Sequence, residues 1–285
     1  MIVPMPMQHI EFQIDGSRDK PITADVTCDE TKRRQPVLIF VHGFKGFKDW
    51  GHFNLLAHLL AAQGIVTVKF NFSYNGTDPT NPVDITDPGT FGNNNLTTEL
   101  NDLGLMIDCV CNQQLPIDKS LYDARNITLM GHSRGGGTVI LKTAEDKRVK
   151  KLVTLAALSE FGVFFNESER ERWRRDGVHY VTNYRTGQRL PMYAQYLDDF
   201  EQNHNRLDIP TQAANIKVPW WCVHGMADQV VDISHARRLK KMNPSLTLVE
   251  VEGASHTFGG THPFNGFQMP TGMAWVKGVI DGIKR

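Results

Sequence analysis

A serine flanked by glycines is the residue of this sequence best placed for covalent chemistry. Ser133 stands in GHSRG (131–135), a match to G-x-S-x-G, directly after the apolar run NITLM and before a stretch with helical spacing. A tight strand-to-helix turn of this kind exposes a nucleophile, and its glycines relieve side-chain crowding. The serine would also lie at a helix amino terminus, where backbone N–H groups favour developing negative charge. A phosphate-binding loop is disfavoured, because no Lys-Ser or Lys-Thr pair follows the glycines.

A serine hydroxyl needs an adjacent base, and the base needs a group that orients it. One order in which such residues follow along a chain is serine, acid, histidine, each after a strand. Asp228 follows the apolar run VPWWCVHG, and His256 follows LTLVEVEG. Asp232 is the alternative acid, although its place near the start of a predicted helix is typical of a helix cap. His262 is the alternative base, farther from its strand. The sequence therefore predicts Ser133, Asp228 and His256 as nucleophile, acid and base.

Backbone N–H groups must stabilise the oxyanion that forms when a serine attacks a carbonyl group. We expect one from Arg134, the residue after the nucleophile, and one from Phe44, in the loop after the first buried strand. His42 in the same loop is expected to brace it rather than to bind a metal, because no spacing of Cys, His and carboxylates indicates a metal site. The predicted chemistry needs no metal and no cofactor.

The elements that would position these residues alternate between strand and helix from residue 36 onward. Strands are predicted over 36–43, 65–72, 126–131, 149–158, 218–225 and 246–253, and helices over 52–64, 96–113, 135–146, 234–242 and 271–284. Two alternating stretches, 8–14 and 22–28, predict a hairpin before them. This order predicts an α/β fold with a mostly parallel central sheet and helices on both faces, in a single domain over 1–285.

The alternation is interrupted between 160 and 212, where the sequence indicates a helix, a hairpin and a second helix. We expect this insertion to form a cap over the nucleophile; packing onto the sheet domain alone is the alternative. The segment contributes aromatic surface, which includes Tyr196 and Phe200, and its candidate substrate contacts are Trp173, Tyr180, Tyr184 and Tyr193. A second interruption, over 73–95, is rich in Asn, Asp, Pro and Gly and predicts a long loop.

The composition disfavours several classes of protein. The 285 residues carry 31 Lys and Arg against 31 Asp and Glu, so no net charge attracts nucleic acid or an anionic membrane. No stretch approaches the roughly 20 apolar residues of a membrane span, and the first residues lack the pattern of a secretory signal. The cysteines are few and scattered, which indicates reduced thiols and a cytoplasmic protein; they are Cys28, Cys109, Cys111 and Cys222.

Four short motifs carry a resemblance to a known family. The combination of VHGFKG, GHSRGG, HGMADQVV and GASHTF resembles the serine-dependent α/β-hydrolases from residue 36 to the end, and the hairpin before it fits the first two strands of that fold. Within this superfamily the chain is similar to bacterial feruloyl/cinnamoyl-type carboxylesterases and related peptidase-like hydrolases. By position, the resemblance implies the same roles for the residues named above. The chain departs from the pattern at Arg134, where the esterases more often carry glutamine, and in the long 73–95 loop.

These observations together predict a serine hydrolase that cleaves a small-molecule carboxylic ester through an acyl-enzyme intermediate. A small peptidase or aminoacyl-amide hydrolase related to prolyl oligopeptidases is the first alternative, although the chain has no accompanying propeller-sized domain. A ligand-binding protein on a hydrolase scaffold is the second, and the complete set of Ser133, Asp228 and His256 disfavours it.

Overall fold

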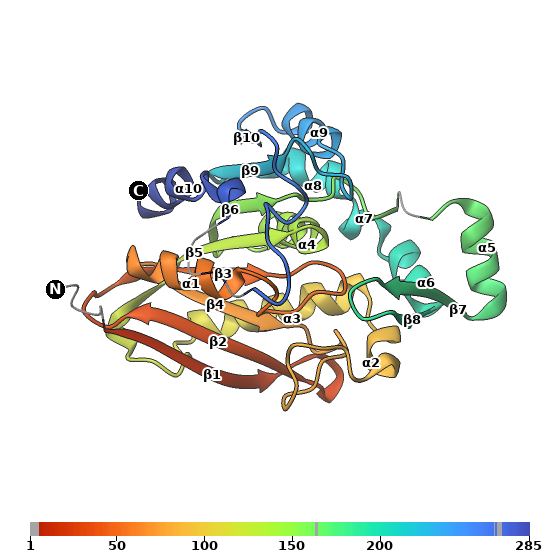
Figure 1. Ribbon diagram of the computed structural model, residues 1–285, viewed down its shortest axis with the longest axis horizontal. Coiled ribbons are helices and arrows are strands. Elements are labelled where there is room, and N and C mark those ends of the chain that lie inside the picture. Colours follow the sequence, from red (N-terminus) through yellow and green to blue (C-terminus); the bar gives the residue numbers. More distant parts are fainter. Residues whose placement is uncertain (1–5, 163–164, 265, 267–269) are drawn as a thin grey trace.

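An eight-stranded sheet forms the centre of the molecule in the order β1-β2-β4-β3-β5-β6-β9-β10 (Figure 1). The structure is a computed structural model and describes residues 6–162, 165–264, 266 and 270–285. The strands are β1 (Met7–Asp15), β2 (Pro21–Asp29), β3 (Gln35–Val41), β4 (Val66–Asn71), β5 (Tyr122–His132), β6 (Val149–Leu155), β9 (Trp220–Gly225) and β10 (Thr247–Val251). β1 pairs antiparallel with β2 and β2 with β4, whereas the other neighbours are parallel. The predicted α/β fold with a mostly parallel sheet is confirmed.

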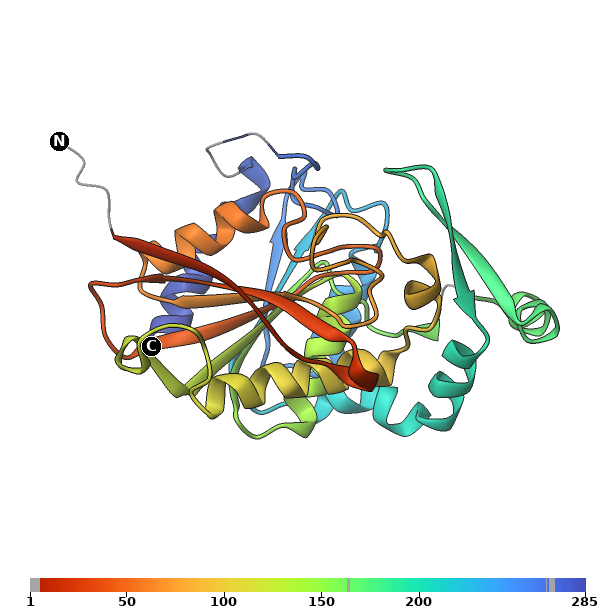
Figure 2. The ribbon, with the colours of Figure 1, turned by 90° about the horizontal axis from the view of Figure 1, so that it is seen from below.

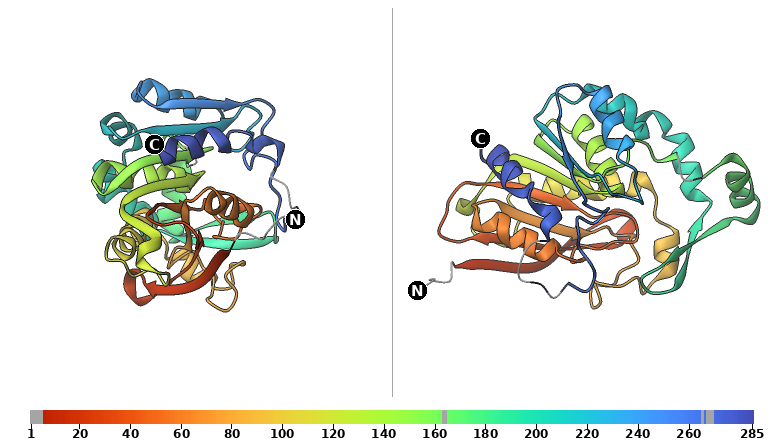
Figure 3. Two further views of the ribbon diagram at one scale, coloured as in Figure 1. Left: turned by 90° about the vertical axis from the view of Figure 1, so that its left-hand side faces the viewer. Right: turned by 45° about the horizontal axis from the view of Figure 1, so that its top comes forward.

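Helices cover both faces of this sheet, as the views in Figure 3 show. They are α1 (Phe53–Ala62), α3 (Leu96–Cys111), α4 (Arg134–Glu145), α8 (Ile209–Asn215), α9 (Ser234–Met242) and α10 (Val276–Lys284). Successive side chains of a strand point to opposite faces, so each buried strand contributes to two cores. In β3, Ile39 belongs to the core shared with α3, α4, α8 and α9, whereas Leu38 and Phe40 belong to the core shared with α1 and α10. This division explains why the parallel strands are continuous apolar runs in the sequence.

Between β6 and β9 the chain leaves the sheet and forms the insertion. It contains α5 (Glu167–Asp176), β7 (Val178–Asn183), β8 (Gln188–Tyr193), α6 (Gln195–Gln202) and α7 (His204–Leu207). β7 and β8 pair with each other as a separate antiparallel hairpin. Figures 1 and 2 show the insertion beside the carboxyl ends of the parallel strands. The chain then returns to the main body through α8, which packs against α4 and α9.

The segment predicted as a loop over 73–95 contains one short helix, α2 (Pro88–Gly92). The Asp87 carboxylate accepts the N–H of Thr90 at 2.9 Å, and Pro88 stands at the first helical position, where no intrahelical N–H bond is lost. Because Asp-Pro-Gly is also a turn signal, composition alone indicated a loop. The helix packs against β8 of the insertion and so joins these two segments.

Two further observations concern the whole described chain. None of the helices in the described ranges combines the length and the hydrophobicity that a membrane span needs. All four cysteines carry free thiols, as the sequence predicts.

Candidate functional site

Ser133 lies on the sharp turn between β5 and α4. Its backbone angles, φ 56° and ψ −120°, fall outside the regions that L-residues normally adopt, so the turn is strained. Two hydrogen bonds hold this conformation: the N–H of Ser133 donates to the carbonyl oxygen of Leu155 at 2.8 Å, and its own carbonyl accepts the N–H of Gly136 at 2.9 Å. The strand-to-helix turn expected from the sequence is therefore present.

Backbone crowding requires the glycines around Ser133. A Cβ atom on Gly131 would overlap the carbonyl oxygen of Gly135, and a Cβ on Gly135 would overlap that of His42, in both cases far inside van der Waals contact. A Cβ on Gly43 would lie 3.0 Å from the Cβ of Ser133. The loop after β3 therefore approaches the serine closely because glycines stand on both sides of the contact.

His256 lies between Ser133 and Asp228. Its Nε2 is 3.0 Å from Oγ of Ser133, and its Nδ1 is 2.8 Å from Oδ2 of Asp228. The histidine comes from the loop after β10 and the aspartate from the loop after β9, so the three side chains meet at the carboxyl ends of parallel strands. Both the Asp228 carboxylate and most of the imidazole are buried. The geometry suits transfer of the serine proton to His256, with the carboxylate fixing the ring and its tautomer.

Asp228 accepts more hydrogen bonds than the sequence suggested. Its Oδ1 accepts the N–H groups of Val230 and Val231, each at 2.9 Å. Nε2 of the fully buried His224 hydrogen-bonds to the carbonyl oxygen of Val231 at 2.8 Å and lies 3.3 Å from Oδ2 of Asp228. Burial raises the pKa of this carboxyl, but hydrogen bonds from His224 and His256 outweigh it and hold the pKa well below its usual range. The acid is therefore ionised at neutral pH.

The two alternative residues have other partners. Asp232 is exposed and accepts the N–H of Ser234 at 2.9 Å, at the start of α9. Nδ1 of His262 accepts the N–H of Gly51 at 3.1 Å, and the ring packs against Phe47 and Trp50. The side chains of Asp232 and His262 thus contact residues other than Ser133, Asp228 and His256.

His132 supports the backbone of the proposed base. Its Nε2 donates to the carbonyl oxygen of His256 at 2.9 Å, and the two ring centroids are 4.8 Å apart. Burial lowers the pKa of His132 to about 3, with a further contribution from His256. The ring is therefore neutral near neutral pH and can hold this hydrogen bond without adding charge to the site. Neither His132 nor His224 was predicted to take part in the site, although they stand within the motifs GHSRGG and HGMADQVV.

Phe44 and Arg134, the expected oxyanion donors, lie together at this site. Both line the same cavity as Ser133 and His256. Among the described residues, none accepts a hydrogen bond from the backbone N–H of either one. The two amides are thus available for a ligand, and their role in oxyanion binding stays a prediction.

Buried charges fix the loop that carries Phe44. Lys48 donates from Nζ to Asp25 at 2.8 Å and to Asp49 at 2.5 Å, while Lys69 donates to the same carboxylates at 2.7 and 2.8 Å. The backbone N–H of Lys48 also donates to Oδ1 of Asn71 at 2.6 Å. Burial lowers the pKa of Lys48, but the two carboxylates outweigh it and raise the pKa above its usual range. This cluster connects the loop after β3 to β2 and β4.

The side chain of His42 makes structural contacts next to the site. Its ring is buried, its Nδ1 lies 2.9 Å from the carbonyl oxygen of Gly43, and its edge contacts Phe72. Burial lowers the pKa of His42 to about 4. Within the ranges that the structure describes, no group of three or more His, Cys, Asp or Glu side chains could hold a metal ion.

A cavity of about 380 Å³ opens at Ser133 and is mostly apolar. It is lined by Phe44, Lys45, Ser133, Arg134, Leu158, Phe161, Phe165, Val181, Met192, Tyr196, Val230, Val231 and His256. Phe165, Val181, Met192 and Tyr196 come from the insertion, so this segment forms one wall of the cavity. The insertion thus contacts the space in front of the serine.

The four aromatic residues expected to contact substrate are not among those that line this cavity. Cross-strand partners in the hairpin share a face: Val181 and Met192 lie on the cavity side, whereas Tyr180 and Tyr193 lie on the other. Tyr184, near the tip of the hairpin, is 90% exposed. Contact between the substrate and Trp173, Tyr180, Tyr184 or Tyr193 stays a prediction, and strand alternation places Tyr180 and Tyr193 on the face away from this cavity.

Trp173 is buried within the insertion. Its Nε1 donates to the carbonyl oxygen of Met192 at 2.7 Å, and its ring stacks on Tyr196 with centroids 5.7 Å apart. It therefore supports the cavity wall from behind, and Tyr196 is the aromatic residue of this pair that lines the cavity.

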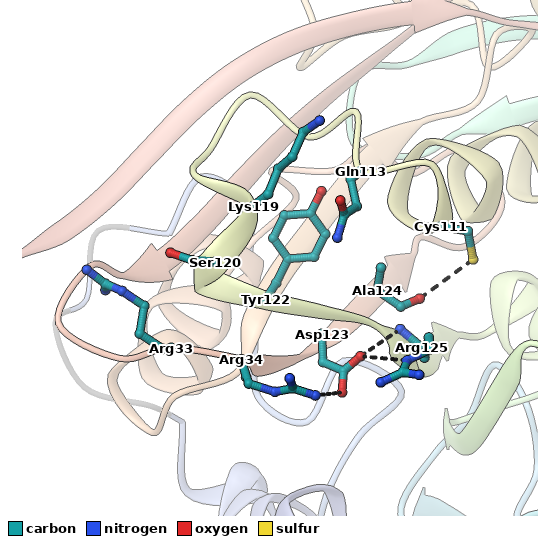
Figure 4. A pocket seen from close by; sticks show the side chains of 10 residues that line it. All are labelled: Arg33, Arg34, Cys111, Gln113, Lys119, Ser120, Tyr122, Asp123, Ala124 and Arg125. Carbon is teal, nitrogen blue, oxygen red and sulfur yellow. Dashed lines mark hydrogen bonds and ion pairs between the residues drawn. The ribbon is translucent and has the colours of Figure 1, made fainter.

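A larger hollow of about 630 Å³ lies at the opposite ends of the strands, where β3 and β5 begin (Figure 4). Nη2 of Arg34 lies 3.6 Å from Oδ2 of Asp123, and Nε of Arg125 lies 3.7 Å from its Oδ1. Of the described residues that line it, Ser120 is the one serine, and none is a histidine. The chemistry of the side chains, rather than the volume, therefore identifies the cavity at Ser133 as the candidate active site.

Residues 38–267 match the sequence model of a family described as the alpha/beta hydrolase family. No curated protein sequence matches the chain.

Solved structures with low sequence identity share the fold. Est1E from Butyrivibrio proteoclasticus, solved with ferulic acid bound, is 17% identical with a TM-score of 0.67, and the match covers 96% of each chain. The monoacylglycerol lipase of Paleococcus ferrophilus is 15% identical with a TM-score of 0.62, over 98% of each chain. The esterase domain of a Rhodothermus marinus protein is 19% identical with a TM-score of 0.57, over 88% of this chain and 90% of that one.

Proposed function

The chain belongs to the alpha/beta hydrolase family, and we propose that it is a serine hydrolase that cleaves a small-molecule carboxylic ester through an acyl-enzyme intermediate. The observation that carries this proposal is the position of His256, with Nε2 3.0 Å from Oγ of Ser133 and Nδ1 2.8 Å from Asp228. A serine becomes a nucleophile when a neighbouring base takes its proton, and this base is oriented by a buried carboxylate.

In the proposed reaction, Oγ of Ser133 attacks the ester carbonyl while His256 takes its proton. The N–H groups of Phe44 and Arg134 stabilise the oxyanion, and Asp228 stabilises the imidazolium that forms. His256 then gives the proton to the leaving alcohol oxygen, which leaves an acyl group on Ser133. Water, activated by the same histidine, attacks the acyl group and releases the carboxylic acid.

The insertion acts as a cap in this proposal. Its residues Val181, Met192 and Tyr196 contribute an apolar wall to the cavity, which supports binding of an ester with an apolar portion. We place the protein in the cytoplasm on the basis of its four free thiols.

A fluorophosphonate probe tests the nucleophile. We expect the wild-type protein to be labelled once, at Ser133, and to hydrolyse p-nitrophenyl and aryl esters. Ser133→Ala should abolish labelling and lower ester turnover by about 10⁴-fold or more, with the fold retained. A Ser133→Ala protein that keeps a tenth of the wild-type rate, or a wild-type protein that is not labelled, would exclude the proposal. Faster cleavage of aminoacyl amides than of esters would assign the same residues to a peptidase instead.

A further inference from the structure

The side chain of Arg134 places a positive charge at the wall of the proposed active site. Its guanidinium forms an ion pair with Glu99 from α3 and lies over the ring of Phe44, with Cζ 4.3 Å from the ring centroid. The Glu99 side chain is only 1% exposed, whereas that of Arg134 is 12% exposed. Arg134 lines the cavity beside Ser133, and Glu99 is not among the lining residues. The carboxylate therefore stands behind the guanidinium, away from the space in which a substrate would bind.

The Glu99 carboxylate is shared with other donors, which limits how fully it neutralises Arg134. Its Oε1 also accepts a hydrogen bond from Nδ2 of Asn94 at 2.8 Å. Burial raises the pKa of Glu99, and the charge of Arg134 opposes this shift without cancelling it. A guanidinium has five N–H donors in a planar fork that fits a carboxylate, and the ion pair with Glu99 engages one nitrogen, Nη2.

A second cation lies against the same aromatic ring. Lys45 follows Phe44, lines the cavity, and has its Nζ 5.5 Å from the centroid of that ring. Its ammonium group donates to the carbonyl oxygen of Thr182 at 2.8 Å, and within the described ranges no carboxylate lies within ion-pair distance of it. Burial lowers the pKa of Lys45, and the nearby charge of Arg134 adds to this effect.

Among the described residues that line the cavity, two therefore carry cationic side chains and none is Asp or Glu. The residues around these cations are largely apolar, and a charge in an apolar wall interacts more strongly with a ligand than one in water. We propose that the substrate carries a carboxylate in addition to its ester group, and that Arg134 and Lys45 bind this carboxylate while Ser133 attacks the ester. This inference rests on the proposed esterase function and names the class of ester.

Two matched pairs of esters test the proposal. The first places the charge on the acyl side: the p-nitrophenyl half ester of adipic acid is compared with the corresponding adipamide ester. The second places it on the alcohol side: para-carboxyphenyl butyrate is compared with para-carbamoylphenyl butyrate. In each pair a carboxamide replaces the carboxylate, so size and shape are matched. We expect wild-type kcat/KM to favour the carboxylate in at least one pair by about tenfold, as for a charge-assisted hydrogen bond.

Three variants then assign this preference to the cavity. Arg134→Gln and Lys45→Gln should each reduce the carboxylate-to-carboxamide ratio toward one, whatever they do to the carboxamide rate itself. Glu99→Gln should raise the ratio, because it removes the charge that opposes Arg134. Arg189→Gln is the matched control: Arg189 lies over Tyr180, on the face of the hairpin away from the cavity, and the ratio should not change.

The outcomes separate this inference from the proposed function. Equal kcat/KM within both pairs for the wild-type protein would overturn the inference and leave the esterase proposal intact. A preference that survives both Arg134→Gln and Lys45→Gln, or that falls equally in Arg189→Gln, would also overturn it. A wild-type protein that cleaves none of the four esters would overturn both. If Glu99→Gln fails to fold, the Arg134 and Lys45 variants decide the question.

Discussion

The imidazole of His132 donates a hydrogen bond to the carbonyl oxygen of His256 across 2.9 Å. The residue before the proposed nucleophile therefore holds the backbone of the proposed base, and the loop after β10 is joined directly to the turn after β5. Because His132 is buried and neutral, this connection requires the tautomer that carries its proton on Nε2.

Buried neutral histidines predict a loss of stability in acid. Burial lowers the pKa of His42 and His52 to about 4 and that of His132 to about 3, from an ordinary value of 6.5. Between these values the unfolded chain binds more protons than the folded one. The stability that depends on these neutral histidines is therefore fully present above pH 6.5, and the free energy of unfolding falls as the pH drops below this value. Each histidine should lower the free energy of unfolding by about 1.4 kcal/mol per pH unit. Urea titrations from neutral pH to about pH 5 measure this slope, and a flat profile would contradict it.

The two candidate acids should differ strongly in activity. Asp228→Asn should lower kcat by about 10⁴-fold, because an amide cannot hold the tautomer of His256 or stabilise its charged form. Asp232→Asn should leave kcat within about twofold, because this exposed side chain only caps α9. Steady-state hydrolysis of p-nitrophenyl acetate compares them. His256→Ala and His262→Ala form a second pair, and an equal loss in either pair would contradict the assignment.

Gly135→Ala should remove activity because it displaces the backbone around Ser133. Its Cβ would overlap the carbonyl oxygen of His42, so either α4 or the loop after β3 must move, and with it Ser133 or Phe44. We expect loss of fluorophosphonate labelling and a lower Tm. The control is Gly278→Ala in α10, where a Cβ meets nothing within 4 Å. This change should raise stability by about 0.5–1 kcal/mol. Normal labelling of Gly135→Ala would show that the turn is less crowded than described.

The hairpin should select acyl groups through one face only. Val181→Ala and Met192→Ala enlarge the cavity and should change the ratio of kcat/KM between short and long p-nitrophenyl esters by about tenfold, as expected for the loss of methyl and methylene contacts. Tyr184→Ala, at an exposed position, should leave this ratio unchanged. A larger change in this ratio for Tyr184→Ala than for Val181→Ala or Met192→Ala would instead support substrate contact by the aromatic residues predicted from the sequence.

Removal of one charge from the buried cluster should destabilise the protein strongly. Asp25 is fully buried between Lys48 and Lys69, so Asp25→Asn leaves two buried ammonium groups short of a partner. We expect a loss of about 3–5 kcal/mol in the free energy of unfolding. Asp108→Asn breaks a solvent-exposed ion pair with Arg148 and should change stability by less than about 1 kcal/mol. Urea unfolding measures both, and similar values for the two variants would contradict the assigned role.

Local patterns in the sequence predict most of the fold. Apolar runs and helical spacing define the sheet and its layers, because each strand buries both of its faces. The turn at Ser133 can also be predicted from the sequence, since backbone crowding restricts positions 131 and 135 to glycine. The order of serine, acid and histidine selects three side chains that lie within hydrogen-bonding distance, and their catalytic role stays a prediction.

Other features depend on contacts between residues far apart in the chain. Lys48 meets Asp25 across 23 positions in the sequence and Lys69 meets Asp49 across 20, and no local pattern connects them. The face of the hairpin that meets the cavity also depends on such contacts: aromatic residues were expected there, whereas Val181 and Met192 line it. The support of Asp228 by His224 could have been found, since the two are four residues apart.

The strand order also determines when a growing chain gains its complete site. β6 pairs with β9, which lies beyond the entire insertion, so β9 and β10 join the sheet only after the whole insertion has been synthesised. Ser133 precedes this point, whereas Asp228 and His256 follow it. A nascent chain that has not yet reached β9 therefore carries the serine without the proposed acid and base.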